Sequence, residues 1–154
     1  MKFAPCETRA ADSRSLPHLP RCILDASVTI AALIEEDRSD EARGILRNVI
    51  SDGAEVPSLW PLEVGNILLL AERRHLLNAV ARRDHLRDLY RLPIAIDNET
   101  ARRAWHDAMA LAERHGLTLY DAAYLELSLR RELPLATFDV SLRRAATASG
   151  VQLL

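Results

Sequence analysis

The chain has 154 residues, of which 49% are hydrophobic, and a formal net charge of -2. This length and apolar content are enough for one domain with a core of its own, so disulfides or structural metals are not needed to stabilise it. A net charge near zero excludes a protein that coats nucleic acid through a broad basic surface, and any contact with nucleic acid must therefore be local.

The first 20 residues contain three prolines among polar residues and no continuous apolar stretch that could form the core of a secretion signal. We therefore expect a flexible N-terminal extension over residues 1–20, one folded domain over residues 21–154, and a cytoplasmic location. The longest apolar runs fall well short of the roughly 18–20 residues that span a bilayer, so no transmembrane helix is expected. The two cysteines and five histidines show no zinc-like spacing.

Short apolar runs of strand length alternate with segments whose apolar residues recur on a helical period. This alternation predicts an α/β fold in which a mostly parallel sheet is covered by helices on both faces. The predicted strands are 22–24, 54–57, 92–96, 134–137 and 151–154. The predicted helices are 28–35, 39–50, a long helix capped by Ser58, 78–91, one from Asp97-Asn98 to Gly116, 119–131 and 140–149.

The long helix after Ser58 tolerates Pro61, because the amides of a first helical turn have no partner within the helix. Its apolar residues between Leu62 and Leu70 lie nearly all round the helix axis instead of on one stripe. Such a helix needs contacts on more than one side. We therefore expect a partner subunit to cover its second face.

Four acidic residues recur at the same kind of place, where a predicted strand passes into a helix or within the first turns of a helix. They are Asp25, Glu63, Asp121 and Asp139. Ligands of an α/β sheet collect at the carboxyl ends of the strands, so these carboxylates are expected to meet in one crevice. Clustered like charges need a cation, and hard oxygen ligands select Mg²⁺ or Mn²⁺. The pattern therefore favours a metal-dependent enzyme acting on phosphoryl groups.

Each acid also has an ordinary structural interpretation. Asp25 and Asp139 stand where an N-cap or an Asx-turn is common. Asp121 has the capping-box spacing from Thr118, and taken alone the cap is its favoured role. Glu63 could be a solvated helix residue, although its apolar neighbours make a fully solvated face less comfortable. The combination of the four, more than any one of them, indicates a site.

The arginines and aromatic residues are compatible with nucleic-acid binding without indicating it. All basic residues except Lys2 are arginines, whose planar guanidinium suits phosphate, but codon bias and solvated helix faces are the favoured explanation. Trp60, Trp105 and Tyr124 could stack on unpaired bases. Core packing is the favoured interpretation for both tryptophans.

Four short motifs, in this order and spacing, make the chain resemble the PIN-domain nucleases, most closely the VapC-type toxin ribonucleases of bacterial toxin–antitoxin pairs. They are LDAS at residues 24–27, PLEVGN at 61–66, YDAAYLE at 120–126 and LATFD at 135–139. The resemblance extends over residues 22–154. The lead of about twenty residues before Asp25 departs from the family, in which the first acid normally lies close to the N-terminus.

The resemblance implies a PIN-like three-layer sandwich of four to five short strands and about seven helices. It also implies a homodimer, an RNA substrate, and a small antitoxin protein whose tail, often carrying an arginine, enters the acidic groove. The acidic quartet would be Asp25, Glu63, Asp121 and Asp139, with Ser27 and Thr137 as hydroxyl residues beside it and Asn66 nearby.

On this interpretation one or two Mg²⁺ or Mn²⁺ ions activate a water that cleaves the phosphodiester bond, without a nucleophilic side chain. Asp25 and Asp139 are expected to be direct ligands. Asp121 would be a ligand or would orient the water, and Glu63 would act on a second metal or through a water. Without metal, the repulsion between the carboxylates should raise at least one pKa.

Two other classes remain open from the sequence. A phospho-aspartate protein, either a receiver domain or a dehalogenase-like phosphatase, also places an aspartate at a strand end. However, Ser27 stands where the phosphatase needs a second acid, and Lys2 is the only lysine available to a receiver. A non-catalytic module with the same fold could instead use the acidic groove to hold the arginines of a partner.

Overall fold

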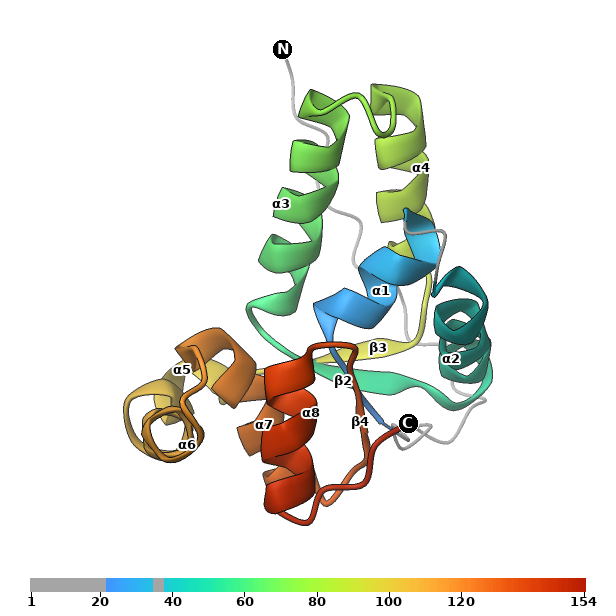
Figure 1. Cartoon of the computed structure of the whole chain (residues 1–154). Coiled ribbons are helices and arrows are strands. Elements are labelled where there is room, and N and C mark those ends of the chain that lie inside the picture. Colours follow the sequence, from blue (N-terminus) through green and yellow to red (C-terminus); the bar gives the residue numbers. More distant parts are fainter. Residues whose placement is uncertain (1–21, 35–37) are drawn as a thin grey trace, which may run out of the picture.

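The computed structural model describes residues 22–34 and 38–154 (Figure 1). The extension expected over residues 1–20 lies outside the described residues. The strands are β1 (Ile23–Leu24), β2 (Ala54–Pro57), β3 (Ile94–Asp97) and β4 (Leu135–Ala136). The helices are α1 (Ala26–Leu33), α2 (Ser39–Asp52), α3 (Trp60–Arg73), α4 (Ala79–Tyr90), α5 (Thr100–Arg103), the π-helical segment η1 (Ala104–Ala108), α6 (Met109–His115), α7 (Leu119–Arg131) and α8 (Val140–Ala148).

The strands pair in parallel in the order β3-β2-β1-β4. β2 and β3 pair over their whole length, whereas β1 is a two-residue strand held between β2 and β4. All four side chains of β1 and β4 are fully buried, as expected for short apolar strands of a parallel sheet that is covered on both faces. The carboxyl ends of β1 and β4 therefore lie side by side, next to Asp25 and Thr137.

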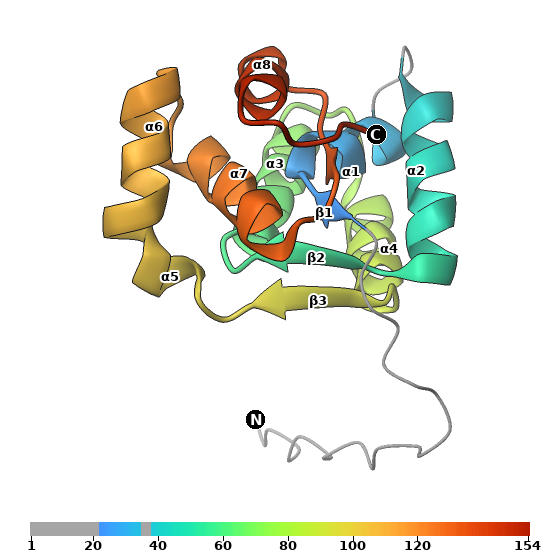
Figure 2. The same cartoon turned by 90° about the horizontal axis from the view of Figure 1, so that it is seen from below.

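The helices cover the sheet and extend beyond it. α7 packs against β1, β2 and β4, and α1 packs against α2 and α3. In Figure 2, α2 and α6 lie at opposite sides of the molecule with the sheet and α7 between them. In Figure 1, α3 and α4 run side by side away from the sheet. The predicted α/β class with a parallel sheet is confirmed. Within the described ranges, no helix is long and apolar enough to cross a membrane.

Two predicted elements differ from those observed. The last strand, predicted over 151–154, is reduced to a single parallel bridge between Leu135 and Leu153. The predicted helix that ends at Gly116 is divided into α5, the π-helical segment η1 and α6. A π turn accommodates one extra residue, which a search for a 3.6-residue period does not detect. Gly116 does end the helix in the left-handed region, with φ 65°.

The predicted helix caps are only partly correct. Thr118 caps α7 as expected, since its side chain accepts a hydrogen bond from the Asp121 amide. Ser58 does not cap α3. The cap position is Leu59, and the Ser58 amide donates instead to Thr100 Oγ1 at 3.0 Å. The contact between the Ser58 amide and Thr100 joins the segment before α3 to the start of α5.

The tryptophans differ in burial. Trp60 is 7% exposed and packs in the core, as predicted. Trp105 is 80% exposed, so the core interpretation is wrong for that residue. It lies in the π-helical segment η1, where the widened turn changes which side chains face the core. The stacking candidate Tyr124 is fully buried.

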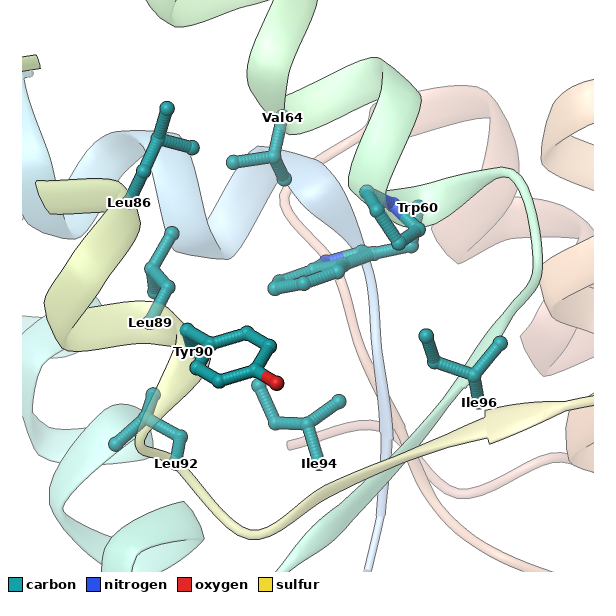
Figure 3. A pocket seen from close by; sticks show the side chains of 9 residues that line it. Trp60, Val64, Leu86, Leu89, Tyr90, Leu92, Ile94 and Ile96 are labelled. Carbon is teal, nitrogen blue, oxygen red and sulfur yellow. The ribbon is translucent and has the colours of Figure 1, made fainter. Parts of the chain in front are cut away.

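An apolar groove of about 440 Å³ lies between α3, α4 and β3. Figure 3 shows its side chains, with the Trp60 indole at its base and Tyr90 at its edge. Tyr90 is 91% exposed, and on the neighbouring outer face of α3 Leu62 is 77% exposed. The apolar residues of α3 thus face the core on one side and solvent on the other in the single chain.

An ion-pair network joins the C-terminal end of α7 to the edge of the sheet. The Arg130 guanidinium donates to Asp97 Oδ2 at 2.9 Å and to Glu126 Oε1 at 2.8 Å. The Asp97 side chain is 1% exposed and also accepts a hydrogen bond from Thr100 Oγ1 at 2.8 Å. The next residue, Arg131, donates to Glu55 in β2. These contacts fix α7, whose N-terminal turn carries Asp121, against β2 and β3.

Candidate active site

Asp25 directly follows β1 and occupies the N-cap position of α1, but its side chain makes no capping hydrogen bond. Instead, its Oδ2 atom accepts hydrogen bonds from Ser27 Oγ at 2.5 Å and from Thr137 Oγ1 at 2.6 Å. The residue is only 6% exposed. Because Thr137 follows β4, the two hydroxyls hold the Asp25 carboxylate where the neighbouring strands β1 and β4 end.

The same two hydroxyls also bind the backbone that follows β4. Ser27 Oγ accepts from the Phe138 amide at 3.0 Å, and Thr137 Oγ1 accepts from the Asp139 amide at 3.1 Å. Ser27 and Thr137 therefore connect Asp25 to the segment that leads into α8. Both residues thus bind backbone amides, as turn residues commonly do, and also donate to the Asp25 carboxylate.

Asp139 lies beside Thr137 and caps α8. Its Oδ1 atom accepts a hydrogen bond from the Leu142 amide at 2.7 Å, which is the structural role that the sequence left open for this residue. The position is still at the carboxyl end of β4, next to the Asp25 side of the sheet. Asp139 thus has a capping role, and its amide is bound to Thr137 Oγ1, but its charge is not among those that shift the pKa of Asp25 or Glu63.

Glu63, in the first turn of α3, is half-buried and reaches across to α7. Its Oε2 atom accepts a hydrogen bond from the phenol of Tyr124, a fully buried residue 61 positions later in the chain. The solvated-helix interpretation is therefore wrong for Glu63. Asn66, one turn further along α3, is exposed to solvent.

Asp121 lies in the first turn of α7. The Thr118 hydroxyl donates to its Oδ2 atom at 2.6 Å and accepts from its amide at 3.1 Å. Of the capping box expected from the spacing, the hydrogen bond from the Asp121 amide to the Thr118 hydroxyl is present. It leaves the Asp121 carboxylate only half-buried, at the same end of the molecule as the charges of Asp25 and Glu63.

The three carboxylates interact electrostatically. Burial raises the pKa of Asp25 most, the hydroxyls of Ser27 and Thr137 lower it, and the charge of Asp121 raises it further, with a net shift upward. The pKa of Glu63 is also raised, chiefly by burial and then by the charges of Asp25 and Asp121, against the lowering effect of the Tyr124 hydrogen bond. The structure therefore brings three acids from distant parts of the chain into one cluster of like charge.

The donor chemistry of this cluster suits a hard divalent cation, because carboxylate oxygens are preferred ligands of Mg²⁺ and Mn²⁺ and a cation offsets their repulsion. Asp25, Glu63 and Asp121 are the residues whose charges a bound ion would relieve. In the part of the chain that the structure describes, no three His, Cys, Asp or Glu side chains already form a metal-binding group.

Two features of this region were missed from the sequence. The contact of Tyr124 with Glu63 joins residues 61 positions apart, and the only local signal is that Tyr124 follows Asp121 by one helical turn. For the network of Arg130 with Asp97 and Glu126, the only signal in the sequence is the i,i+4 spacing of Glu126 and Arg130. Neither signal specifies its long-range partner.

Comparison with known proteins identifies the family of the chain. The model of the PIN domain family matches residues 22–148, and the chain belongs to the PIN-domain family. Within that family it is 32% identical to Ribonuclease VapC3 of Pyrobaculum aerophilum over 121 residues, which cover 77% of this chain and 89% of the relative. It is 31% identical to Ribonuclease VapC1 of Mycobacterium tuberculosis over 134 residues, covering 86% and 94% respectively. The predicted PIN-domain, VapC-type assignment is confirmed.

A solved structure shares the fold. The crystal structure of PAE2754 from Pyrobaculum aerophilum superposes with a TM-score of 0.62 at 22% identity, over 82% of this chain and 79% of that one. The family match sets aside the phospho-aspartate alternative, because receiver domains and dehalogenase-like phosphatases are different families.

Proposed function

We propose that this protein is an endoribonuclease that depends on Mg²⁺ or Mn²⁺ and acts as the toxin of a type II toxin–antitoxin pair. One observation carries the proposal: Asp25, Glu63 and Asp121 come from three separate segments of the chain, yet the charge of Asp121 raises the pKa of the buried Asp25, and the charges of Asp25 and Asp121 raise the pKa of Glu63. Acids crowded in this way need a function that offsets the repulsion, and perturbed pKa values in a cluster are typical of functional sites. The likeness to two ribonucleases named VapC supports RNA as the substrate.

In this mechanism Asp25, Asp121 and Asp139 would hold the metal, and Glu63 would act on a second metal or through a water. The ion, when bound, would supply an activated water and polarise the phosphate. Ser27 and Thr137 keep the Asp25 carboxylate in one orientation through the two hydrogen bonds to its Oδ2 atom. Asn66 is exposed on α3, where it could contact the substrate backbone.

The partners follow from the same proposal. A small antitoxin protein would neutralise the site by placing a basic tail in the acidic groove, and a homodimer would cover the exposed side of α3. The membrane has no part in this function, and the protein would act in the cytoplasm on cellular RNA.

Metal-dependent cleavage is the decisive experiment. We expect purified protein to cleave RNA with Mg²⁺ or Mn²⁺ and to lose this activity with a chelator. Asp25→Asn and Asp121→Asn should each reduce the rate by at least about 100-fold, because metal activation of water supplies several kcal/mol of the barrier reduction.

The matched control is Asp40→Asn, since the Asp40 side chain is fully exposed in the first turn of α2 and its ion pair is with Arg43 on the same helix. Its rate should equal that of the unmodified protein. Unchanged cleavage in folded Asp25→Asn would contradict the site. A folded, unmodified protein that cleaves no RNA with Mg²⁺ or Mn²⁺ would favour the non-catalytic module that holds the arginines of a partner.

A further inference from the structure

Tyr124 is a fully buried residue of α7 whose hydroxyl group contacts the acidic cluster. It is 0% exposed, and its hydroxyl donates to Glu63 Oε2. A hydroxyl buried without a partner costs about 1–3 kcal/mol, so the native packing keeps this hydrogen bond formed. The Glu63 carboxylate is therefore held by a group that cannot move away into solvent.

The position of Tyr124 on α7 adds a second constraint. It follows Asp121 by three residues, so both side chains project from the same face of the helix. One helix thus presents Asp121 directly to the cluster and fixes Glu63 from α3 through Tyr124. The Arg130 network locks the other end of α7 to the sheet, which limits sliding of this face.

We propose that Tyr124 is a positioning residue that orients Glu63 toward the metal side of the cluster, with one carboxylate oxygen held by the phenol and the other left for the ion or its water. This inference rests on the proposed function, because it assigns Glu63 to the metal site. Tyr124 itself touches neither metal nor substrate, and its effect passes through Glu63.

A double-mutant cycle on metal affinity tests the coupling. Mn²⁺ binding is measured without RNA, from the electron paramagnetic resonance signal of free Mn²⁺. Tyr124→Phe keeps the ring and removes only the hydroxyl, and it should weaken Mn²⁺ binding by about 10-fold, as is typical when a group supporting a ligand is lost. In a Glu63→Ala background, Tyr124→Phe should change the affinity by less than about two-fold.

The control is Tyr90→Phe, which removes the hydroxyl of a tyrosine that is 91% exposed. It should leave Mn²⁺ binding unchanged. Unaltered binding in Tyr124→Phe, or two effects that simply multiply in the double variant, would overturn the proposal. If Tyr124 and Glu63 show no coupling in Mn²⁺ affinity while metal-dependent cleavage is intact, only this inference is wrong. Coupled Mn²⁺ binding without any RNA cleavage would remove the proposed function instead.

A second measurement does not require Tyr124→Phe to fold. The chain has three tyrosines, Tyr90, Tyr120 and Tyr124, so their ring Cζ carbons can be resolved in a ¹³C-labelled sample. In Glu63→Ala the Tyr124 resonance should shift because its phenol has lost its acceptor, while those of the two exposed tyrosines stay in place. Three unchanged resonances would show that no such hydrogen bond exists in solution.

Discussion

At the scale of single residues, Asp25 is subject to opposing requirements. Burial and the charge of Asp121 disfavour its ionised form, and the hydroxyls of Ser27 and Thr137 favour it, so that its pKa is raised on balance. A raised carboxyl pKa means that the folded state binds a proton more readily than the unfolded state. The metal-free protein is therefore destabilised by this carboxylate at neutral pH, which is a common property of functional sites.

We expect Asp25→Asn to be more stable than the unmodified metal-free protein at pH 7, by about 1 kcal/mol, which corresponds to a rise of about 2–4 °C in Tm. The amide oxygen can accept the same two hydroxyl hydrogen bonds, while the charge is removed. The difference should shrink as the pH falls through the raised folded pKa and vanish below about 4, where the carboxyl is protonated in both states. Thermal unfolding in chelator over this pH range measures it. A less stable Asp25→Asn at pH 7 would contradict the crowding argument.

At the scale of elements, the position of α7 depends on charge pairs at its C-terminal end as well as on apolar packing. Burial alone would raise the pKa of Asp97, but hydrogen bonds from Arg130 and Thr100 lower it overall. The stability that this pair contributes is therefore present above the ordinary aspartate pKa and is lost as the pH falls through the lower folded value. α7 thus has its functional residue at one end and its anchor at the other.

Arg130→Met should destabilise the fold by about 3 kcal/mol, because the buried Asp97 carboxylate would lose its hydrogen-bonded guanidinium and keep only the longer ion pair with Arg131 at 3.6 Å. The matched control is Arg87→Met on α4, where the ion pair with Asp84 is more than 45% exposed on both sides. That change should cost less than about 1 kcal/mol. Chemical denaturation at pH 7 compares the two, and similar losses would show that the network is not specific.

At the scale of the whole molecule, the outer face of α3 is an apolar surface that the other described residues, 22–34 and 38–154, leave exposed. Leu62 is 77% exposed, and Leu69, seven residues later on the same face of the helix, is 36% exposed. Packing in the core therefore accounts for the apolar residues on only one face of α3. A second copy of the chain is the occupant that the proposed homodimer requires.

We expect a dimer in sedimentation equilibrium and a shift to monomer in Leu69→Glu, because a charge placed in an apolar interface would lose its hydration without gaining a partner. Ile50→Glu is the control, since Ile50 is 60% exposed on α2, at a distance from α3 (Figure 1). It should leave the dimer intact. A monomeric unmodified protein, or a dimer that Leu69→Glu does not affect, would rule out this face.

Much of the fold and part of the site could be predicted from the sequence because the signals are local. The apolar periods located most helices and strands, and α7 was placed over the residues that it occupies. The Thr118 cap and the left-handed Gly116 were correct because both depend on backbone geometry within one turn. The ordered acidic motifs identified the family, since a parallel sheet gathers residues at its strand ends whatever their separation in the chain.

The sequence by itself thus determined the fold class, the family and the acidic residues of the candidate site. Only the tertiary structure decided that Glu63 is bound by Tyr124, that Asp97 is paired with Arg130, and that Trp105 faces solvent. The physical reason is the distance along the chain over which each interaction acts. Period and capping act over one or two turns, whereas burial and charge pairing depend on which distant segments the packed core brings together.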